Sequence, residues 1–269
     1  MKKICSVLDI SRQGYYKSKK KKGTKKLEEE MIILLVQSQR KKMPLIGGKK
    51  LYKLLSPDLS KMGIELGRDK FLSLLRRNNL LIQRKKRYAK TTNSSHRFWI
   101  YDNLIKGIKP RGIDEIYVSD ITYIRLRDSF LYLSLITDLY SRKIVGYDLS
   151  DSLNLEGSIR ALKMSIKGKG DLSGLIHHSD RGLQYCSNKY TELLTSKNIK
   201  ISMSEKGNPY ENAVAERVNG ILKEEFMLGE TYETKAQAYR AVKEAVETYN
   251  ENRPHMSIDY MTPNQKYAA

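Results

Sequence analysis

The chain has 269 residues, of which 50 are Lys or Arg, 30 are Asp or Glu and two are cysteines. This length can hold two domains, whereas two cysteines far apart in the sequence exclude a disulfide framework and favour a reducing cytoplasm. No apolar run approaches the roughly 18 residues of a membrane span and no secretory signal is visible, so no membrane partner is expected.

The excess positive charge lies at one end of the chain. Residues 1–110 contain 29 basic and 8 acidic residues, a net charge of +21, and the remaining residues contain 21 and 22, a net charge of −1. This distribution indicates a polyanion-binding N-terminal part joined to a nearly neutral second part. Within the lysine run 19–22 the charge is interpreted only as solubilising.

The N-terminal part is expected to be helical. Residues 1–26 are interpreted as the end of a small helical unit followed by a basic linker, and residues 27–90 as a helix-turn-helix-like DNA-binding domain. A helix from Leu27, with acids first and bases last, precedes a turn at Gly47-Gly48 and a helix over 49–55. A small helical bundle without a DNA-binding role would show the same pattern.

The last helix of this domain is predicted within residues 68–82. It places Phe71, Leu72, Leu74 and Leu75 on one face and leaves its basic residues for solvent. In helix-turn-helix proteins the second helix enters the major groove of DNA. The residues expected to contact DNA are Arg68, Lys70, Arg76, Arg77, Lys85, Lys86 and Arg87. Residues 83–97 lack periodicity, and residues 91–111 are predicted to be a linker.

Residues 112–269 are predicted to form an α/β domain. Strands are expected over 115–124, 130–137, 143–149, 175–178 and 199–203, and helices over 155–166, over 188–196 and from near 211 and 234. Three antiparallel strands followed by alternating helices and strands describe a mixed sheet flanked by helices. This order is similar to the ribonuclease H-like fold, here with a C-terminal helical tail and preceded by the basic all-α domain.

Three carboxylates lie in sequence motifs that packing alone does not explain. Asp120 lies in the apolar strand EIYVSDITYI, Asp180 follows a predicted strand in HHSDRGLQY, and Glu216 lies in KGNPYENAVAE at the start of a predicted helix. Adjacent strands would present the two aspartates side by side, with the glutamate above them. Such hard oxygen ligands suit two divalent cations, Mg²⁺ or Mn²⁺, which can activate both oxygens of a phosphodiester exchange.

These words resemble the DDE transposase and retroviral-integrase superfamily, and more narrowly the OrfB product of two-frame bacterial insertion sequences. The matching motifs are DITY (120–123), HSDRGLQY (178–185), NPYENAVAE (208–216), YNENRPH (249–255) and Thr262-Pro263. The segments ISRQGYY and LLRRNNLLI also resemble the part that precedes the core in this family. The chain departs from the family at Tyr117, where Trp is usual, and at Gly47-Gly48, where a Tyr-Gly-Tyr-like word is common.

The resemblance implies a DNA transposase in which Asp120, Asp180 and Glu216 bind two Mg²⁺ or Mn²⁺ ions and catalyse 3′-end cleavage and strand transfer. Its expected partners are the element's terminal inverted repeats, target DNA, further copies of the chain and an upstream helix-turn-helix/leucine-zipper frame product, in a bacterial cytoplasm near the nucleoid. Two alternatives stay open: a ribonuclease H-like nuclease that does not join strands, and a catalytically silent DNA-binding protein.

Residues beside these motifs allow two interpretations each. His178 either hydrogen-bonds a metal-bound water or a phosphate, or satisfies a neighbouring carboxylate. Lys206 and Asn212 either touch DNA or belong to a solvated loop. Arg253 either binds phosphate or is structural, and His255 is interpreted in the same way.

Three further residues are expected to be structural. Asp138 follows an apolar strand and precedes Arg142, which favours a turn cap or an ion pair. Phe98 and Trp99 are expected to pack the linker and not to stack on bases.

Overall fold

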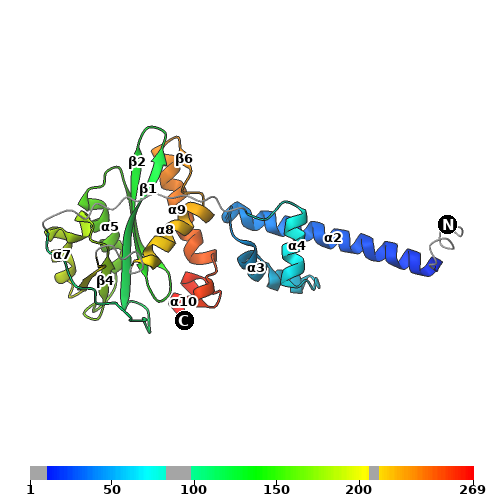
Figure 1. Ribbon diagram of the computed structural model, residues 1–269, viewed down its shortest axis with the longest axis horizontal. Helices are drawn as coiled ribbons and strands as arrows, with labels where there is room; N and C mark the ends of the chain where they lie inside the picture. Colours follow the sequence, from blue (N-terminus) through cyan, green and yellow to red (C-terminus); the bar gives the residue numbers. More distant parts are fainter. Residues whose placement is uncertain (1–10, 83–97, 206–211) are drawn as a thin grey trace. The chain divides into compact units, whose positions relative to one another are not determined.

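The computed structural model of the chain describes residues 11–82, 98–205 and 212–269. It divides into two compact units, Met1–Arg84 and Lys85–Ala269 (Figure 1). The first unit is helical and the second combines a sheet with helices. None of the helices in the described ranges has the length and apolarity needed to cross a membrane.

The helical unit contains α2 (Arg12–Lys42), α3 (Gly48–Lys61) and α4 (Arg68–Arg77). Helix α2 is continuous through the lysine-rich segment, so the linker predicted to end at Lys26 is wrong for the described residues. The physical reason is that lysine is a good helix former and the segment contains no proline, which leaves only Gly23 to oppose the helix.

The core of the helical unit follows helical spacing. Leu51, Leu55 and Leu59 are buried on one face of α3, and Phe71, Leu74 and Leu75 are buried on α4. This confirms the predicted apolar face of the last helix, in which Leu72 is half-buried. An amphipathic helix of this kind leaves its polar face for solvent or for a partner.

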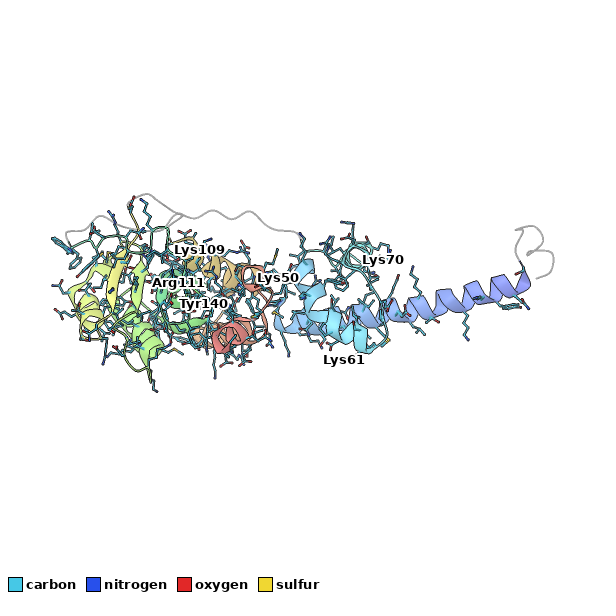
Figure 2. The ribbon with its side chains drawn as sticks, turned by 90° about the horizontal axis from the view of Figure 1, so that it is seen from below. Lys50, Lys61, Lys70, Lys109, Arg111 and Tyr140 are labelled. Carbon is cyan, nitrogen blue, oxygen red and sulfur yellow. The ribbon has the colours of Figure 1, made fainter. Side chains whose placement is uncertain are left out.

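The basic residues predicted to contact DNA are exposed on this unit. Arg68, Lys70, Arg76 and Arg77 all face solvent on α4, and Lys61 and Lys70 can be followed in Figure 2. Arg77 also pairs with Glu29 of α2 (3.0 Å), and Arg68 pairs with Asp69 (3.0 Å). Lys85, Lys86 and Arg87 lie outside the described residues.

The second unit is built on a mixed sheet. Its strands are β1 (Ile116–Leu126), β2 (Phe130–Asp138), β3 (Ile144–Ser150), β4 (Ile176–Ser179), β5 (Lys200–Met203) and β6 (Thr231–Tyr232). The strand order is β3-β2-β1-β4-β5, and β6 pairs with β1. β1, β2 and β3 are antiparallel, whereas β4 and β5 run parallel to β1. The five predicted strands are confirmed, and β6 was not predicted because two residues are too short for a periodic signal.

Helices cover both faces of the sheet (Figure 1). They are α5 (Leu155–Ile166), α6 (Leu183–Cys186), α7 (Asn188–Thr195), α8 (Ala213–Glu225), α9 (Lys235–Asn252), the 3-10 helix Met256–Ile258 and α10 (Pro263–Ala268). Tyr117 of β1 joins the core cluster that contains Leu162 of α5 and Tyr190 of α7, whereas Val118 packs against Ala215 of α8. Because strand side chains alternate, the even-numbered residues of this part of β1 face α8.

Close packing of α5 on the sheet depends on Gly146 of β3. A Cβ atom at this position would overlap the backbone oxygen of Ala161 in α5, and it would lie 2.9 Å from Ser165 Cβ. Only glycine therefore lets the helix approach the strand this closely, which keeps α5 against the same face as Tyr117.

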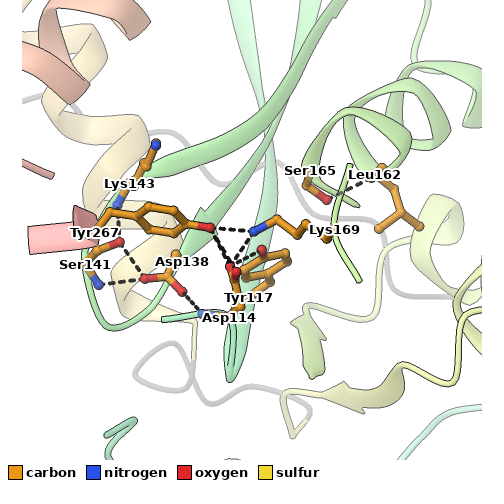
Figure 3. Close-up of polar contacts among 9 residues, drawn as sticks. All are labelled: Asp114, Tyr117, Asp138, Ser141, Lys143, Leu162, Ser165, Lys169 and Tyr267. Atoms are coloured by element: carbon orange, nitrogen blue, oxygen red, sulfur yellow. Dashed lines mark hydrogen bonds and ion pairs between the residues drawn. The ribbon is translucent and has the colours of Figure 1, made fainter. Parts of the chain in front are cut away.

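A polar network holds the C-terminal helix α10 against the start of β1 (Figure 3). Asp114 accepts hydrogen bonds from Tyr117 Oη (2.5 Å), Lys169 Nζ (2.6 Å) and Tyr267 Oη of α10 (2.8 Å). Burial alone would raise the pKa of Asp114, but the hydrogen bonds from Lys169, Tyr117 and Tyr267 outweigh burial and lower it. Lys143 lies over the Tyr267 ring at 4.2 Å and adds a cation–π contact.

The same network shows the role of Asp138. Its Oδ1 atom accepts from the backbone N–H (2.7 Å) and hydroxyl (2.5 Å) of Ser141, and its Oδ2 atom accepts from the N–H of Asp114 (2.9 Å). Asp138 therefore caps the turn between β2 and β3, which confirms the structural interpretation. Trp99, in contrast, is 77% exposed, and its expected packing on the linker stays a prediction because residues 91–97 lie outside the described residues.

Candidate active site

Asp120 lies in the middle of β1, opposite Leu135 of β2. On the other side, β1 pairs with β4 in parallel register, with Val118 beside His178. Two residues further along this register, Asp120 comes level with Asp180, which directly follows β4. Because side chains alternate along parallel strands, both aspartates belong to the face that α8 covers.

Asp180 begins the turn between β4 and α6. Its Oδ1 atom accepts a hydrogen bond from the backbone N–H of Gly182 (2.9 Å), and the next residue, Arg181, donates from Nε to the carbonyl of Ser204 (2.8 Å). The Asp180 side chain is half-buried. The strand therefore ends with a carboxylate whose orientation is set by the turn that follows it.

Glu216 lies in the first turn of α8, where a carboxylate is favoured by the helix dipole. Two asparagines, the N-cap residue Asn212 and Asn219 within α8, contact β1. Asn212 Nδ2 donates to the carbonyl of Ser119 (3.1 Å), and Asn219 Nδ2 donates to Asp120 Oδ2 (2.7 Å). Asn212, Glu216 and Asn219 are spaced four and three residues apart, so they share one face of the helix. The exposed Glu216 side chain thus lies on the helix face that is bound to Asp120.

The electrostatics of this group show a concentration of negative charge. Burial, followed by repulsion from Asp180, raises the pKa of Asp120 to about 7, although hydrogen bonds from Asn219 and from the N–H of Ile121 act in the opposite direction. Glu216 contributes further repulsion at Asp120. Burial also raises the pKa of Asp180, against the effect of the Gly182 N–H. Among the described residues, no Lys, Arg or His forms an ion pair with Asp120 or Asp180.

The donor set is chemically suited to a hard divalent cation, because it consists of carboxylate oxygens that lack a counter-charge. Within 11–82, 98–205 and 212–269, no group of three or more His, Cys, Asp or Glu side chains is gathered closely enough to hold a metal ion. Asp120, Asp180 and Glu216 interact electrostatically in this arrangement but do not form a closed ligand set. Mutual repulsion of three carboxylates opposes their closure in the absence of a cation.

His178 lies on β4 and is fully buried. Its Nδ1 atom forms a hydrogen bond with the hydroxyl of Ser202 on β5 (2.8 Å), and this hydroxyl also accepts from the N–H of Leu104. The observed hydrogen bond is to a serine hydroxyl and not to a carboxylate. Asn212 is buried as well, so the solvated-loop interpretation is wrong for this residue. Lys206 lies outside the described residues.

Arg253 is structural, as one of its two interpretations proposed. Its guanidinium is 2% exposed and forms two hydrogen bonds of 2.9 Å with Glu225 at the end of α8. Glu225 is nine residues beyond Glu216, about 13 Å along a helix with a rise of ~1.5 Å per residue. His255 is also buried and packs its ring against Tyr249 at 5.1 Å. Neither residue belongs to the carboxylate group.

Two contributors to the site were not predicted from the sequence. Asn219 was missed, because its position three residues after Glu216 indicates a shared helix face but not its contact with Asp120. His177 lies on the opposite face of β4, where its Nε2 atom contacts the hydroxyls of Ser119 (2.7 Å) and Tyr190 (3.0 Å). Burial lowers the pKa of His177 to about 3, which makes it a neutral core residue that supports the strand before Asp180.

Comparisons with known proteins identify the family of the chain. Two family models, both described as integrase core domain, match residues 111–209 and 197–263. An insertion element IS600 protein of 31 kDa from Shigella sonnei, described as uncharacterized, is 31% identical over 97% of this chain and 96% of its own length. The chain belongs to the insertion-sequence branch of the DDE transposase/integrase superfamily.

Other relatives of this transposase-family chain carry functional names. The transposase for insertion sequence element IS904 of Lactococcus lactis is 37% identical over 61% of this chain and 67% of its own length. Transposase InsF for insertion sequence IS3A of Escherichia coli is 29% identical over 78% of this chain and 74% of its own. The matches support a transposase/integrase function for this chain.

A solved structure is similar in fold. A chain of the simian T-cell lymphotropic virus intasome, solved in complex with PP2A regulatory subunit B56 gamma, aligns with a TM-score of 0.51 at 18% identity. The alignment covers 83% of this chain and 75% of that one. The fold is therefore that of an integrase, with a ribonuclease H-like mixed sheet between helices and a helical region before it, as the sequence predicted.

Proposed function

We propose that this transposase cleaves DNA at 3′ ends and transfers the strands through Asp120, Asp180 and Glu216. The observation that carries the proposal is the position of Asp120. Its carboxylate lies level with Asp180 in the parallel register, is bound to the helix that bears Glu216, and has no basic partner among the described residues. Such a concentration of uncompensated carboxylates is a common feature of functional sites.

Two divalent cations, Mg²⁺ or Mn²⁺, fit this donor set. Asp120 and Glu216 would hold one, and Asp120 and Asp180 the other. Bound cations would supply activation of the attacking oxygen and stabilisation of the leaving oxygen. Asp120 is suited to the shared position because each of its oxygens accepts one hydrogen bond, from Ile121 N–H and from Asn219, and a carboxylate oxygen keeps a second lone pair for a ligand bond.

The reaction proceeds in two exchanges at phosphorus. In the first, water attacks the phosphodiester at the end of the element, the bond to the 3′ oxygen breaks, and a 3′-hydroxyl and a 5′-phosphate form. In the second, that 3′-hydroxyl attacks another phosphodiester, so one bond forms and one breaks, and a new 3′-hydroxyl leaves. No serine or tyrosine nucleophile is required, because the protein forms no covalent bond to DNA.

The proposed substrates and partners follow from the charge of the chain and from its family. Phosphates of the terminal inverted repeats would be neutralised by the exposed basic side chains of α4, which are Arg68, Lys70, Arg76 and Arg77. Target DNA is the second substrate. Two element ends must be joined in one complex, which favours a homo-oligomer, and an upstream helix-turn-helix/leucine-zipper frame product would supply further end recognition.

The test uses the full chain with DNA fragments that carry the element's ends, in the presence of Mn²⁺ or Mg²⁺. We expect cleaved and joined products from the parent protein, and neither from Asp120→Asn, Asp180→Asn or Glu216→Gln, while DNA binding is retained. Glu192→Gln, an exposed glutamate of α7, is the matched control and should leave both products unchanged.

The outcomes separate the alternatives. Cleavage without any joined product would replace the proposal with a ribonuclease H-like nuclease. DNA binding without cleavage, in a parent protein that is folded and supplied with cation, would identify a catalytically silent DNA-binding protein. Full activity in any of the three carboxylate variants would remove that residue from the proposed site.

A further inference from the structure

We propose that Asn219 is a positioning residue for Asp120. The Asn219 amide holds the Asp120 carboxylate in the orientation that cation binding requires, and its Oδ1 atom accepts a hydrogen bond from a cation-bound water. The inference rests on the proposed function, since it assigns a role to a residue beside the proposed triad. The motif that identifies the triad ends at Glu216, and Asn219 lies one helical turn beyond it.

The first support is the contact itself. Asn219 Nδ2 donates to Asp120 Oδ2 at 2.7 Å, across 99 positions of the sequence. The other oxygen of Asp120 accepts from the N–H of Ile121 at 2.9 Å. With one donor on each oxygen, the carboxylate cannot rotate without losing a hydrogen bond. The hydrogen bond from Ile121 comes from β1 itself, whereas the one from Asn219 comes from α8.

The second support is the remaining atom of the amide. Asn219 is 6% exposed, and its Oδ1 atom is buried without a hydrogen bond from any described residue. A buried amide oxygen without a donor is unfavourable, and such groups are rare in folded proteins. Because Nδ2 of the same amide is bound to Asp120 Oδ2, Oδ1 is held one amide group away from that carboxylate. A water that is coordinated to a cation is a strong donor of the kind this oxygen lacks.

The third support is the register of α8. Asn212, two turns earlier on the same helix face, is 5% exposed and donates to the carbonyl of Ser119, the residue before Asp120. The two amides therefore bind neighbouring residues of β1 and bracket Glu216 between them. Asn212 binds only backbone, whereas Asn219 binds the carboxylate itself, so a specific effect on the cation site is expected from Asn219.

The experiment compares Asn219→Leu with a matched control, Asn250→Leu, in the full chain. Asn250 of α9 is also a partly buried asparagine that binds a strand through both amide atoms, at Ile144 of β3, with distances of 2.9 and 3.0 Å. Both variants remove an amide that joins a helix to the sheet. Mn²⁺ affinity is measured by calorimetry, and stability is measured by urea unfolding in the presence of a chelator.

We expect Asn219→Leu to weaken Mn²⁺ binding by ~10–100-fold, the usual effect of losing a group that orients a metal ligand. Asn250→Leu should lower stability and leave Mn²⁺ affinity unchanged. If Asn219→Leu does not fold, Asn219→Ser replaces it, because the shorter side chain withdraws the donor from Asp120. An Asn219 variant that binds Mn²⁺ as tightly as the parent protein would overturn the proposal.

A double-mutant cycle provides a readout that needs neither cation nor DNA. Loss of Asn219 leaves a buried carboxylate without its donor, so Asn219→Leu should cost more stability in the parent protein than in an Asp120→Asn background. Equal losses in both backgrounds would overturn the positioning role. If the parent protein binds no Mn²⁺, the proposed function and the proposed hydrogen bond to a cation-bound water are both refuted. The double-mutant cycle still decides whether Asn219 acts through Asp120.

Discussion

Replacing Asp120 by Asn is expected to stabilise the cation-free protein at alkaline pH, although it abolishes the proposed chemistry. The pKa of Asp120 is raised from an ordinary value of 3.8 to about 7, with burial as the main cause and Asp180 as the second. A carboxylate whose pKa is raised on folding favours the folded state only while it is protonated. The parent protein therefore loses stability as pH rises from about 4 to about 7, and the full cost is present above pH 7.

The magnitude follows from the same two values. A difference of about 3 pH units corresponds to at most ~4 kcal/mol, at 1.36 kcal/mol per unit. Asp120 is half-buried and keeps part of its hydration, so we expect about 2 kcal/mol. Asn at this position retains an acceptor for Ile121 N–H, and its amide can donate to Asn219 Oδ1, which has no donor among the described residues. The substitution thus removes the charge, and one hydrogen bond between the two side chains is kept when the Asn219 amide turns over.

The assay is urea unfolding of both proteins in the presence of a chelator at pH 4, 6 and 8. The free energy of unfolding of Asp120→Asn relative to the parent protein should increase between pH 4 and 8. Glu192→Gln, on the exposed face of α7, controls for the loss of an acidic side chain. Excess Mn²⁺ should make the parent protein the more stable of the two, because it stabilises only the parent protein, by ~2.7 kcal/mol at 100 times the Kd. A difference between the two proteins that does not change with pH would refute the reasoning.

Three further predictions concern other parts of the molecule. Arg253→Met removes the guanidinium that pairs with buried Glu225 and should lower the free energy of unfolding by ~3–5 kcal/mol. The loss should be smaller when Glu225→Met is added, and equal losses would contradict the ion-pair explanation. Arg76→Gln with Arg77→Gln should reduce the slope of log binding constant against log salt by up to ~2 in DNA-binding titrations, and an unchanged slope would exclude phosphate contacts from α4. Asp138→Ala leaves two donors of Ser141 in the β2–β3 turn and the N–H of Asp114 before β1 without their acceptor. It should cost ~1–3 kcal/mol in urea unfolding, whereas an unchanged midpoint would show that the cap is dispensable.

The sequence by itself determined β1 to β5 and the helices α4, α5, α7, α8 and α9, and it supplied the three carboxylates of the proposed site. Period-two apolar patterns specify strands locally, so β1, β2 and β3 were predicted to within two residues of their observed bounds. Turn residues around Asp180 and Glu216 marked those acids as positioned side chains, and the family resemblance extended to the same words. The helical part was predicted less well, because the high lysine content of residues 17–26 was interpreted as a linker although lysine also favours helix.

Only the tertiary structure decided which polar groups meet. Asn219 reaches Asp120 across 99 positions, and Arg253 reaches Glu225 from the next helix, so no local pattern could reveal either pair. The same limit applies to Asn212 and His178, whose sequence neighbours gave no sign that their side chains are buried. Local patterns record which face of an element is apolar, whereas the partner of a buried polar atom depends on how separate elements pack. For this reason the carboxylates of the proposed triad could be named from the sequence, whereas the contact of Asn219 with Asp120 required the tertiary structure.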